Sequence, residues 1–195
     1  MCLQMSMVKT FEEMTEAGSL VEFEEHMGQA MFVSHQWLSM HHPDPEGEQL
    51  RTLQQALRNI MSGTSQVGLP VTTEIYLGRL QCPTANHFNQ RDLFIWLDYC
   101  CCPQGASVLA ARDQQEAIDS IPVYVARCRF FVILCPALMH SDQNLTLSQQ
   151  TWCQRGWCRT ERVALELAER EDGWMVVIES ATHQTLPQKG REAPP

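Results

Sequence analysis

The residues with the clearest chemical potential lie in one short segment, Arg155-Gly156-Trp157-Cys158-Arg159-Thr160-Glu161. Trp157 and Glu161 are four residues apart, so they share a face if the segment opens a helix. A carboxylate beside an aromatic ring can hold sugar hydroxyls and stabilise the positive charge that develops when a glycosidic bond breaks. The segment therefore predicts a site that cleaves such a bond, with Glu161 as its catalytic group.

Both residues also have a simpler structural interpretation. Glu161 could cap its own helix, because acidic side chains near a helix N-terminus are stabilised by the macrodipole and by free N–H groups. Trp157 could belong to the core, with its indole N–H bonded to a backbone carbonyl. The residue types alone leave these alternatives open.

Four apolar runs predict the strands that would position this segment, at residues 30–35, 93–98, 129–135 and 174–179. Such continuous runs are typical of strands that are buried on both faces of a parallel sheet. Apolar residues at helical spacing follow the first three runs, and Pro122 should kink or split the second helix. The alternation predicts an α/β fold, with a parallel sheet of four to five strands and helices on both faces.

In such sheets ligands bind beyond the carboxyl ends of the strands, at the point where the strand order reverses. We expect five residues at this edge to contact substrate: Ser34, Trp37, Asp98, Arg155 and Trp157. Asp98 could equally cap the turn that follows its strand. Ser34 and His35 point to opposite faces and make a poor nucleophile–base pair, so His35 is interpreted as a structural histidine.

The rest of the chain predicts a lead-in, an insertion and a tail. Residues 1–29 form an acidic, helical lead-in, residues 30–181 the α/β domain, and residues 182–195 a polar, disordered tail. The irregular stretch 62–92 predicts an insertion with a short strand or helix near residues 73–80. A polar loop is expected at residues 139–150.

Composition excludes several classes of partner. A net charge of −9 with only 14 Lys and Arg argues against nucleic acid and anionic membranes. No run reaches the roughly 18 apolar residues of a membrane span. Nine cysteines without a signal peptide favour a reducing, cytoplasmic location, and their spacing matches no zinc pattern, so no metal is expected.

The order of these pieces resembles a known family. A strand ending Phe32-Val33-Ser34-His35, a strand ending Trp96-Leu97-Asp98-Tyr99, a later Phe-Phe-Val-Ile-Leu strand and the turn Trp157-Cys158-x-x-Glu161 follow one another. The chain resembles the Toll/interleukin-receptor (TIR) domain superfamily, in a divergent TIR-like branch, over about residues 30–180. The resemblance implies a flavodoxin-like fold and hydrolysis or cyclisation of NAD at the nicotinamide–ribose bond, with Glu161 as the essential glutamate. NAD would be a substrate, no cofactor is implied, and the implied protein partners are further copies or other TIR-like domains.

The sequence departs from the family pattern in its triple cysteine, Cys100-Cys101-Cys102, and in the insertions at 62–92 and 139–150. Two further functions therefore stay open. The chain could be a non-catalytic TIR-like module that signals by self-association, or a related nucleoside or nucleotide hydrolase.

Overall fold

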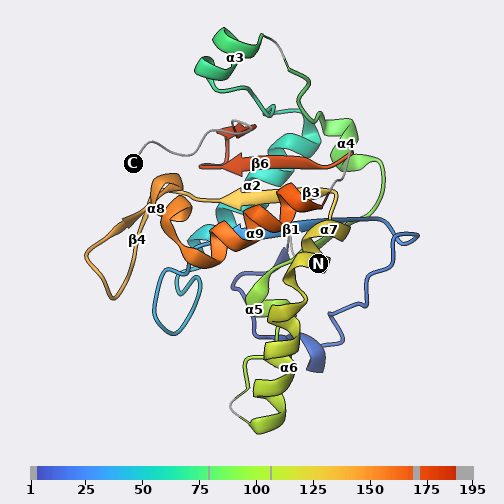
Figure 1. The fold of residues 1–195 in the computed structure, drawn as a ribbon, viewed down its shortest axis with the longest axis vertical. Helices are drawn as coiled ribbons and strands as arrows, with labels where there is room; N and C mark the ends of the chain where they lie inside the picture. The colour runs from blue at the N-terminus through green and yellow to red at the C-terminus, as the bar shows by residue number, and fades with distance from the viewer. Residues whose placement is uncertain (1–3, 79, 106, 169–171, 188–195) are drawn as a thin grey trace.

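A five-stranded sheet forms the centre of the computed structural model, which describes residues 4–78, 80–105, 107–168 and 172–187. Its strands are β1 (Gln29–His35), β2 (Leu93–Trp96), β3 (Phe130–Leu134), β6 (Trp174–Ile178) and β7 (Gln184–Thr185). Their order is β2-β1-β3-β6-β7, and only β7 is antiparallel to its neighbour (Figure 1). The predicted α/β fold is confirmed, and the order corresponds to that of flavodoxin-like sheets.

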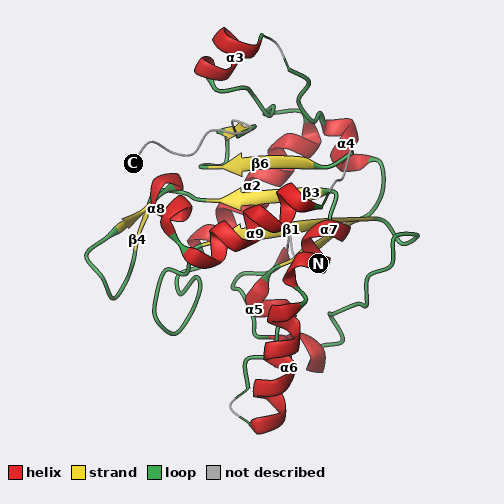
Figure 2. Cartoon of the chain, in the orientation of Figure 1, coloured by secondary structure: helices red, strands yellow, loops and turns green. Residues whose placement is uncertain are grey.

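Helices cover both faces of the sheet, as the continuous apolar strands predict. One core cluster joins Val33 and Val132 to α2 (Glu48–Ser62) and α4 (Ala85–Asn89). The other joins Phe32 and Phe131 to α7 (Ile121–Arg127), α8 (Gln149–Gln154) and α9 (Gly156–Leu167). Figures 1 and 2 show α9 and α7 on the near face of the sheet and α2 behind it. Alternate residues of one strand thus enter two separate cores.

The helix predicted around Pro122 is split as expected. It forms α6 (Val108–Asp119) and α7, with Ser120 between them and the proline in the first turn of α7. Proline fits there because its missing N–H has no partner at that position in any helix. The break lets α7 pack against α9 while α6 extends away from the sheet (Figure 2).

The insertions carry short elements of their own. Residues 62–92 contain α3 (Val71–Leu77), which confirms the expected short element, and also α4. The loop predicted at 139–150 contains an antiparallel pair, β4 (Leu138–Met139) and β5 (Thr146–Leu147), and runs into α8. Two further short helices are α1 (Phe11–Glu16) in the lead-in and α5 (Asp98–Cys101) after β2.

The end of the chain differs from its prediction. Part of the segment expected to be a disordered tail forms β7, which pairs with β6, and Gln184 in this strand is buried. Ser65 donates a hydrogen bond to Gln184 Oε1 at 2.8 Å, so the insertion after α2 helps to hold the strand. Residues 188–195 of the predicted tail lie outside the described residues. The two-residue strand was missed because it is too short and too polar to give a strand pattern.

Within the described ranges, no helix combines the length and the apolar character that crossing a membrane requires.

Candidate functional site

Two groups of polar side chains meet at the carboxyl end of β1. Ser34 and His35 are the last two residues of this strand and pair with Ile133 and Leu134 of β3. The strand order reverses here, since β2 lies on the other side of β1, and this is the position at which open α/β sheets bind ligands. Because successive residues of a strand point to opposite faces, Ser34 and His35 organise separate networks.

We call Trp152, Ser34 and Glu161 the glutamate network. Ser34 is 1% exposed, and its hydroxyl donates a hydrogen bond to Glu161 Oε2. It accepts a hydrogen bond from the indole Nε1–H of Trp152 at 2.9 Å, and Trp152 is equally buried. The consecutive helices α8 and α9 therefore meet the distant strand β1 at one hydroxyl.

Glu161 is only partly buried, and its two oxygens have different surroundings. Oε2 is bonded to Ser34, whereas Oε1 accepts no hydrogen bond from the described residues. Oε1 is also not among the buried polar atoms that lack a partner, so solvent reaches it. One oxygen of the carboxyl group is thus held, and the other is available to a ligand.

Burial raises the pKa of Glu161 from its ordinary value of 4.5 to about 7. The hydrogen bond from Ser34 opposes this shift, the charge of Asp98 adds to it, and the positive charges of His35 and Arg155 oppose it. A carboxyl group with this pKa is partly ionised at neutral pH, so it can exchange a proton there, and its ionised form can stabilise a positive charge.

The capping alternative for Glu161 does not hold. Helix α9 begins at Gly156, which places Glu161 in the second turn rather than the first. The N-cap residue is Arg155, and no side chain caps the helix. The carboxylate of Glu161 is therefore directed to the end of β1 and not to its own helix N-terminus.

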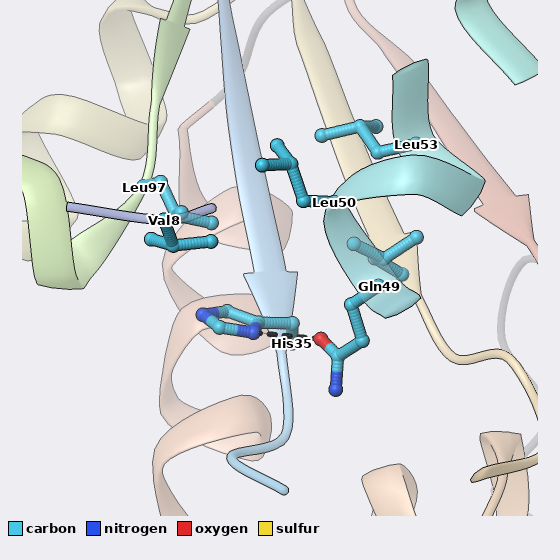
Figure 3. Close-up of a pocket in the computed structure, with 7 residues that line it drawn as sticks. Val8, His35, Gln49, Leu50, Leu53 and Leu97 are labelled. Carbon is cyan, nitrogen blue, oxygen red and sulfur yellow. Dashed lines mark hydrogen bonds between the residues drawn. The ribbon is translucent and has the colours of Figure 1, made fainter. Parts of the chain in front are cut away.

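We call Gln49, His35, Asp98 and Trp37 the histidine network. His35 Nδ1 lies 2.8 Å from Gln49 Oε1, and His35 Nε2 lies 3.0 Å from Asp98 Oδ1. Figure 3 shows the imidazole at the end of β1 with its hydrogen bond to Gln49. The other Asp98 oxygen accepts the indole N–H of Trp37 at 3.0 Å, and Oδ1 also accepts the Tyr99 N–H at 2.7 Å.

The hydrogen bonds determine the protonation of His35. Gln49 donates its Nε2 to the Gln36 carbonyl at 2.7 Å, which turns its Oε1 toward the imidazole. Both ring nitrogens thus face acceptors, and both carry a proton in the imidazolium form. Burial opposes this charge, but the charge and hydrogen bond of Asp98, with smaller contributions from Gln49 and Glu161, raise the pKa of His35.

The pKa of Asp98 is shifted in the opposite direction to that of His35. Burial favours its neutral form, but the charge of His35 and the hydrogen bonds from His35, Trp37 and Tyr99 lower its pKa. The structural interpretation of His35 is supported, because its side chain is 3% exposed and held at both nitrogens. Asp98 bonds the adjacent backbone as the turn alternative predicted, and it also anchors His35.

A cavity of about 10 Å³ lies beside His35, lined by Val8, Gln49, Leu50, Leu53, Leu97 and Leu134 (Figure 3). Its volume is at the lower limit for one water molecule, and its walls are mostly apolar. It is a packing gap and not a substrate site.

An open hollow of about 380 Å³ lies at the start of α9, lined by Arg155, Gly156, Trp157 and Thr160. The Trp157 side chain is 55% exposed, so the core alternative for this residue is wrong. Glu161 is not one of the lining residues, although the charge of Arg155 acts on its carboxyl group. The structure therefore brings Ser34 and Glu161 together, joins Trp37 to Asp98, and places Arg155 and Trp157 in the neighbouring hollow.

The sequence did not predict that Trp152 and Gln49 belong to these two networks. Trp152 is five residues before Trp157 and gave no signal of its own, because a buried tryptophan is ordinarily a core residue. Gln49 sits at the start of an amphipathic helix, and a polar residue on the apolar face of α2 was the available signal.

The thiol of Cys158 also lies at this edge. None of the eight described cysteines forms a disulfide within the described ranges. Burial raises the pKa of Cys158, next to the glutamate network, to about 12, so its reactive thiolate is rare at neutral pH. The described ranges contain no group of three or more His, Cys, Asp and Glu residues arranged to hold a metal ion.

Comparisons with family models, with curated proteins and with solved structures find no match for this chain.

Proposed function

We propose that this chain is a divergent TIR-like domain that cleaves the nicotinamide–ribose bond of NAD, with Glu161 as its catalytic carboxylate. The observation that carries the proposal is a partly buried glutamate at the carboxyl end of the strand where the sheet order reverses. One of its oxygens is held by Ser34. The other is reached by solvent.

The proposed reaction needs charge stabilisation more than proton donation. Nicotinamide leaves with the electron pair of the bond, which neutralises its ring nitrogen, so no acid has to protonate it. The ribose becomes oxocarbenium-like, and an ionised Glu161 stabilises that positive charge. Water then adds to the ribose and releases a proton, which gives ADP-ribose and nicotinamide.

The residues near Glu161 are suited to an anionic nucleotide with aromatic rings. Arg155 can pair with a phosphate, and the exposed indole of Trp157 can stack on a ring. Both line the open hollow at the start of α9. Ser34 would hold the glutamate in place. The indole N–H of Trp37 and one oxygen of Asp98 already bind each other, so substrate contacts of these two residues stay a prediction.

The test is incubation of the purified protein with NAD, at high protein concentration and with crowding agents, while nicotinamide is followed by chromatography. We expect release that is reduced at least about 100-fold in Glu161→Gln, since one preorganised electrostatic group contributes this much to many enzymes. Glu166→Gln is the matched control, because Glu166 lies on the same helix, exposed, and pairs with Arg162. The value of kcat/KM should rise with pH through about 7, as Glu161 ionises.

Two outcomes would contradict the proposal. No nicotinamide under these conditions would reject the activity, and equal activity in wild type and Glu161→Gln would reject the site. Competition with other nucleosides and nucleotides distinguishes an NAD enzyme from a broader N-glycoside hydrolase.

A second candidate, a module that acts by self-association, is favoured by exposed apolar residues on α9. Val163 and Leu167 are four residues apart on this helix and are 52% and 75% exposed. Exposed apolar neighbours of this kind are typical of protein contacts. Light scattering of wild type and Leu167→Glu, beside the NAD assay, tests it: an oligomer that this substitution dissociates and that never cleaves NAD would favour the module.

A further inference from the structure

The direction of hydrogen bonding in the glutamate network is fixed at one end. An indole N–H is a donor and has no acceptor capacity, whereas a serine hydroxyl has one proton and two lone pairs. Trp152 Nε1 lies 2.9 Å from Ser34 Oγ, so the hydroxyl must accept there. The Ser34 proton consequently points away from Trp152.

Glu161 Oε2 is the strong acceptor on the other side of Ser34. The thiol of Cys158 also lies beside Ser34, but sulfur is a weak acceptor, and Cys158 donates to the His35 carbonyl at 3.9 Å. Hydrogen bonds therefore run in one direction, from Trp152 through Ser34 to Glu161. A carboxyl group that accepts at Oε2 carries its exchangeable proton on Oε1.

We propose that Trp152 is a positioning residue: its indole N–H orients the Ser34 hydroxyl as a donor to Glu161 Oε2 and so leaves Oε1 as the oxygen that exchanges its proton. The role of Oε1 toward a substrate rests on the function proposed above. The orientation of Ser34 does not, so the two can be tested separately.

We call the hydrogen bonds that run from Trp152 through Ser34 to Glu161 the relay. The relay also stabilises the ionised form of Glu161, because a hydrogen bond to a carboxylate favours its charge. The other groups that face Glu161 are Asp98, His35, Arg155 and Cys158. All four remain when Trp152 is changed to Phe. Loss of the indole N–H should therefore act on Glu161 only through Ser34.

The experiment is a carbon-detected NMR titration of protein labelled at the glutamate side-chain carboxyl carbon, with the Glu161 signal assigned from its absence in Glu161→Gln. We expect Trp152→Phe to raise the pKa of Glu161 by about half a unit, because Ser34 becomes a weaker and less oriented donor. Trp96→Phe is the control, since Trp96 packs in the same core cluster and has no described bond to Ser34. It should leave the titration unchanged.

A double-mutant cycle separates the relay from a general change in packing. In a Ser34→Ala background, Trp152→Phe should shift the pKa of Glu161 no further. An equal shift with and without Ser34, or no shift at all, would overturn the proposal.

A measurement on the unmodified protein covers the case in which Trp152→Phe does not fold. The Trp152 indole N–H signal in a nitrogen–proton spectrum should titrate with the midpoint of Glu161, and this titration should disappear in Glu161→Gln. An indole signal that does not follow Glu161 would contradict the relay.

The activity assay then separates the relay from the function. If the protein cleaves NAD, the acidic limb of kcat/KM should move upward by the same half unit in Trp152→Phe, which is about a threefold loss at pH 6. If Trp152→Phe cleaves NAD with an unshifted acidic limb, the relay is overturned and the proposed function stands. A relay seen by NMR in a protein that never cleaves NAD would reject only the function.

Discussion

Two adjacent residues at the end of β1 organise networks of opposite character. In the histidine network both nitrogens of His35 and both oxygens of Asp98 have partners. In the glutamate network Oε2 of Glu161 is bonded and Oε1 has no partner among the described residues. The histidine network pairs its charges, whereas the glutamate network keeps a carboxyl group whose charge is disfavoured by burial.

The two networks show which polar groups at this sheet edge hold the fold together and which can take part in a reaction. An ion pair whose histidine is buried and whose polar atoms all have partners holds elements together and offers a ligand less than an unpaired oxygen does. A partly buried carboxyl group with one unpaired oxygen and a raised pKa is costly for the fold and available for a reaction. We therefore expect substitutions in the histidine network to change stability, and substitutions in the glutamate network to change activity and its pH dependence.

The largest expected effect is on stability, from His35→Ala. The substitution leaves a cavity beside the existing gap, removes the charge that faces Asp98 and leaves Gln49 Oε1 without its donor. We expect the free energy of unfolding to fall by about 3–5 kcal/mol, measured by chemical denaturation at pH 6.

His183→Ala is the matched control for His35→Ala. The His183 side chain is 63% exposed and pairs with Glu179 at 3.2 Å. Surface pairs of this kind contribute about 0–1 kcal/mol. Similar losses in the two variants would show that the histidine network is not a structural anchor.

The next effect is the pH dependence of stability. The folded pKa of Glu161, about 7, lies above its ordinary value of 4.5, so the unfolded chain ionises first as the pH rises. Ionisation of Glu161 therefore destabilises the fold progressively between pH 4.5 and about pH 7, by about 3 kcal/mol in total. Glu161→Gln should abolish this fall in stability between pH 4.5 and 6.5, as followed by denaturation at each pH.

The histidine network should still respond in Glu161→Gln. The pKa of His35 is raised above 6.5, so its contribution is complete below that pH and is lost as the pH rises through the folded pKa. The pKa of Asp98 is lowered from 3.8, so its contribution is lost only as the pH falls below that value. An unchanged slope between pH 4.5 and 6.5 in Glu161→Gln would contradict the raised pKa of Glu161.

The sequence predicted the scaffold of this site better than the site itself. Buried parallel strands give continuous apolar runs, and β1, β2, β3 and β6 lie where those runs are. The juxtaposition of Ser34 and Glu161 at the sheet edge was also expected, since both lie where strands and the following helices meet.

The partners within the networks could not be predicted in the same way. Trp152 and Ser34 are 118 residues apart, and His35 and Asp98 are 63 apart, so no local spacing connects them. Sequence patterns report which face a residue lies on, but the direction of a hydrogen bond depends on strand register and helix packing. The two-residue strands β4, β5 and β7 were not predicted for a related reason: their pairing, and not their composition, defines them as strands.

The smallest expected effect on stability comes from Trp157→Ala, and it gives the sharpest contrast between fold and function. The Trp157 side chain is 55% exposed in the hollow at the start of α9. Its loss should lower the free energy of unfolding by about 1–2 kcal/mol, because a little less than half of the residue is removed from water on folding. If the ring stacks on the substrate, KM for NAD should rise by roughly 5- to 10-fold, since aromatic stacking contributes about 1 kcal/mol.

Trp174→Ala is the matched control, because it removes a half-buried tryptophan of the opposite core cluster. It should lower stability without a specific change in KM. A stable Trp157→Ala protein with unchanged KM would place the substrate elsewhere along the sheet edge and leave Arg155 and Ser34 as the residues to examine next.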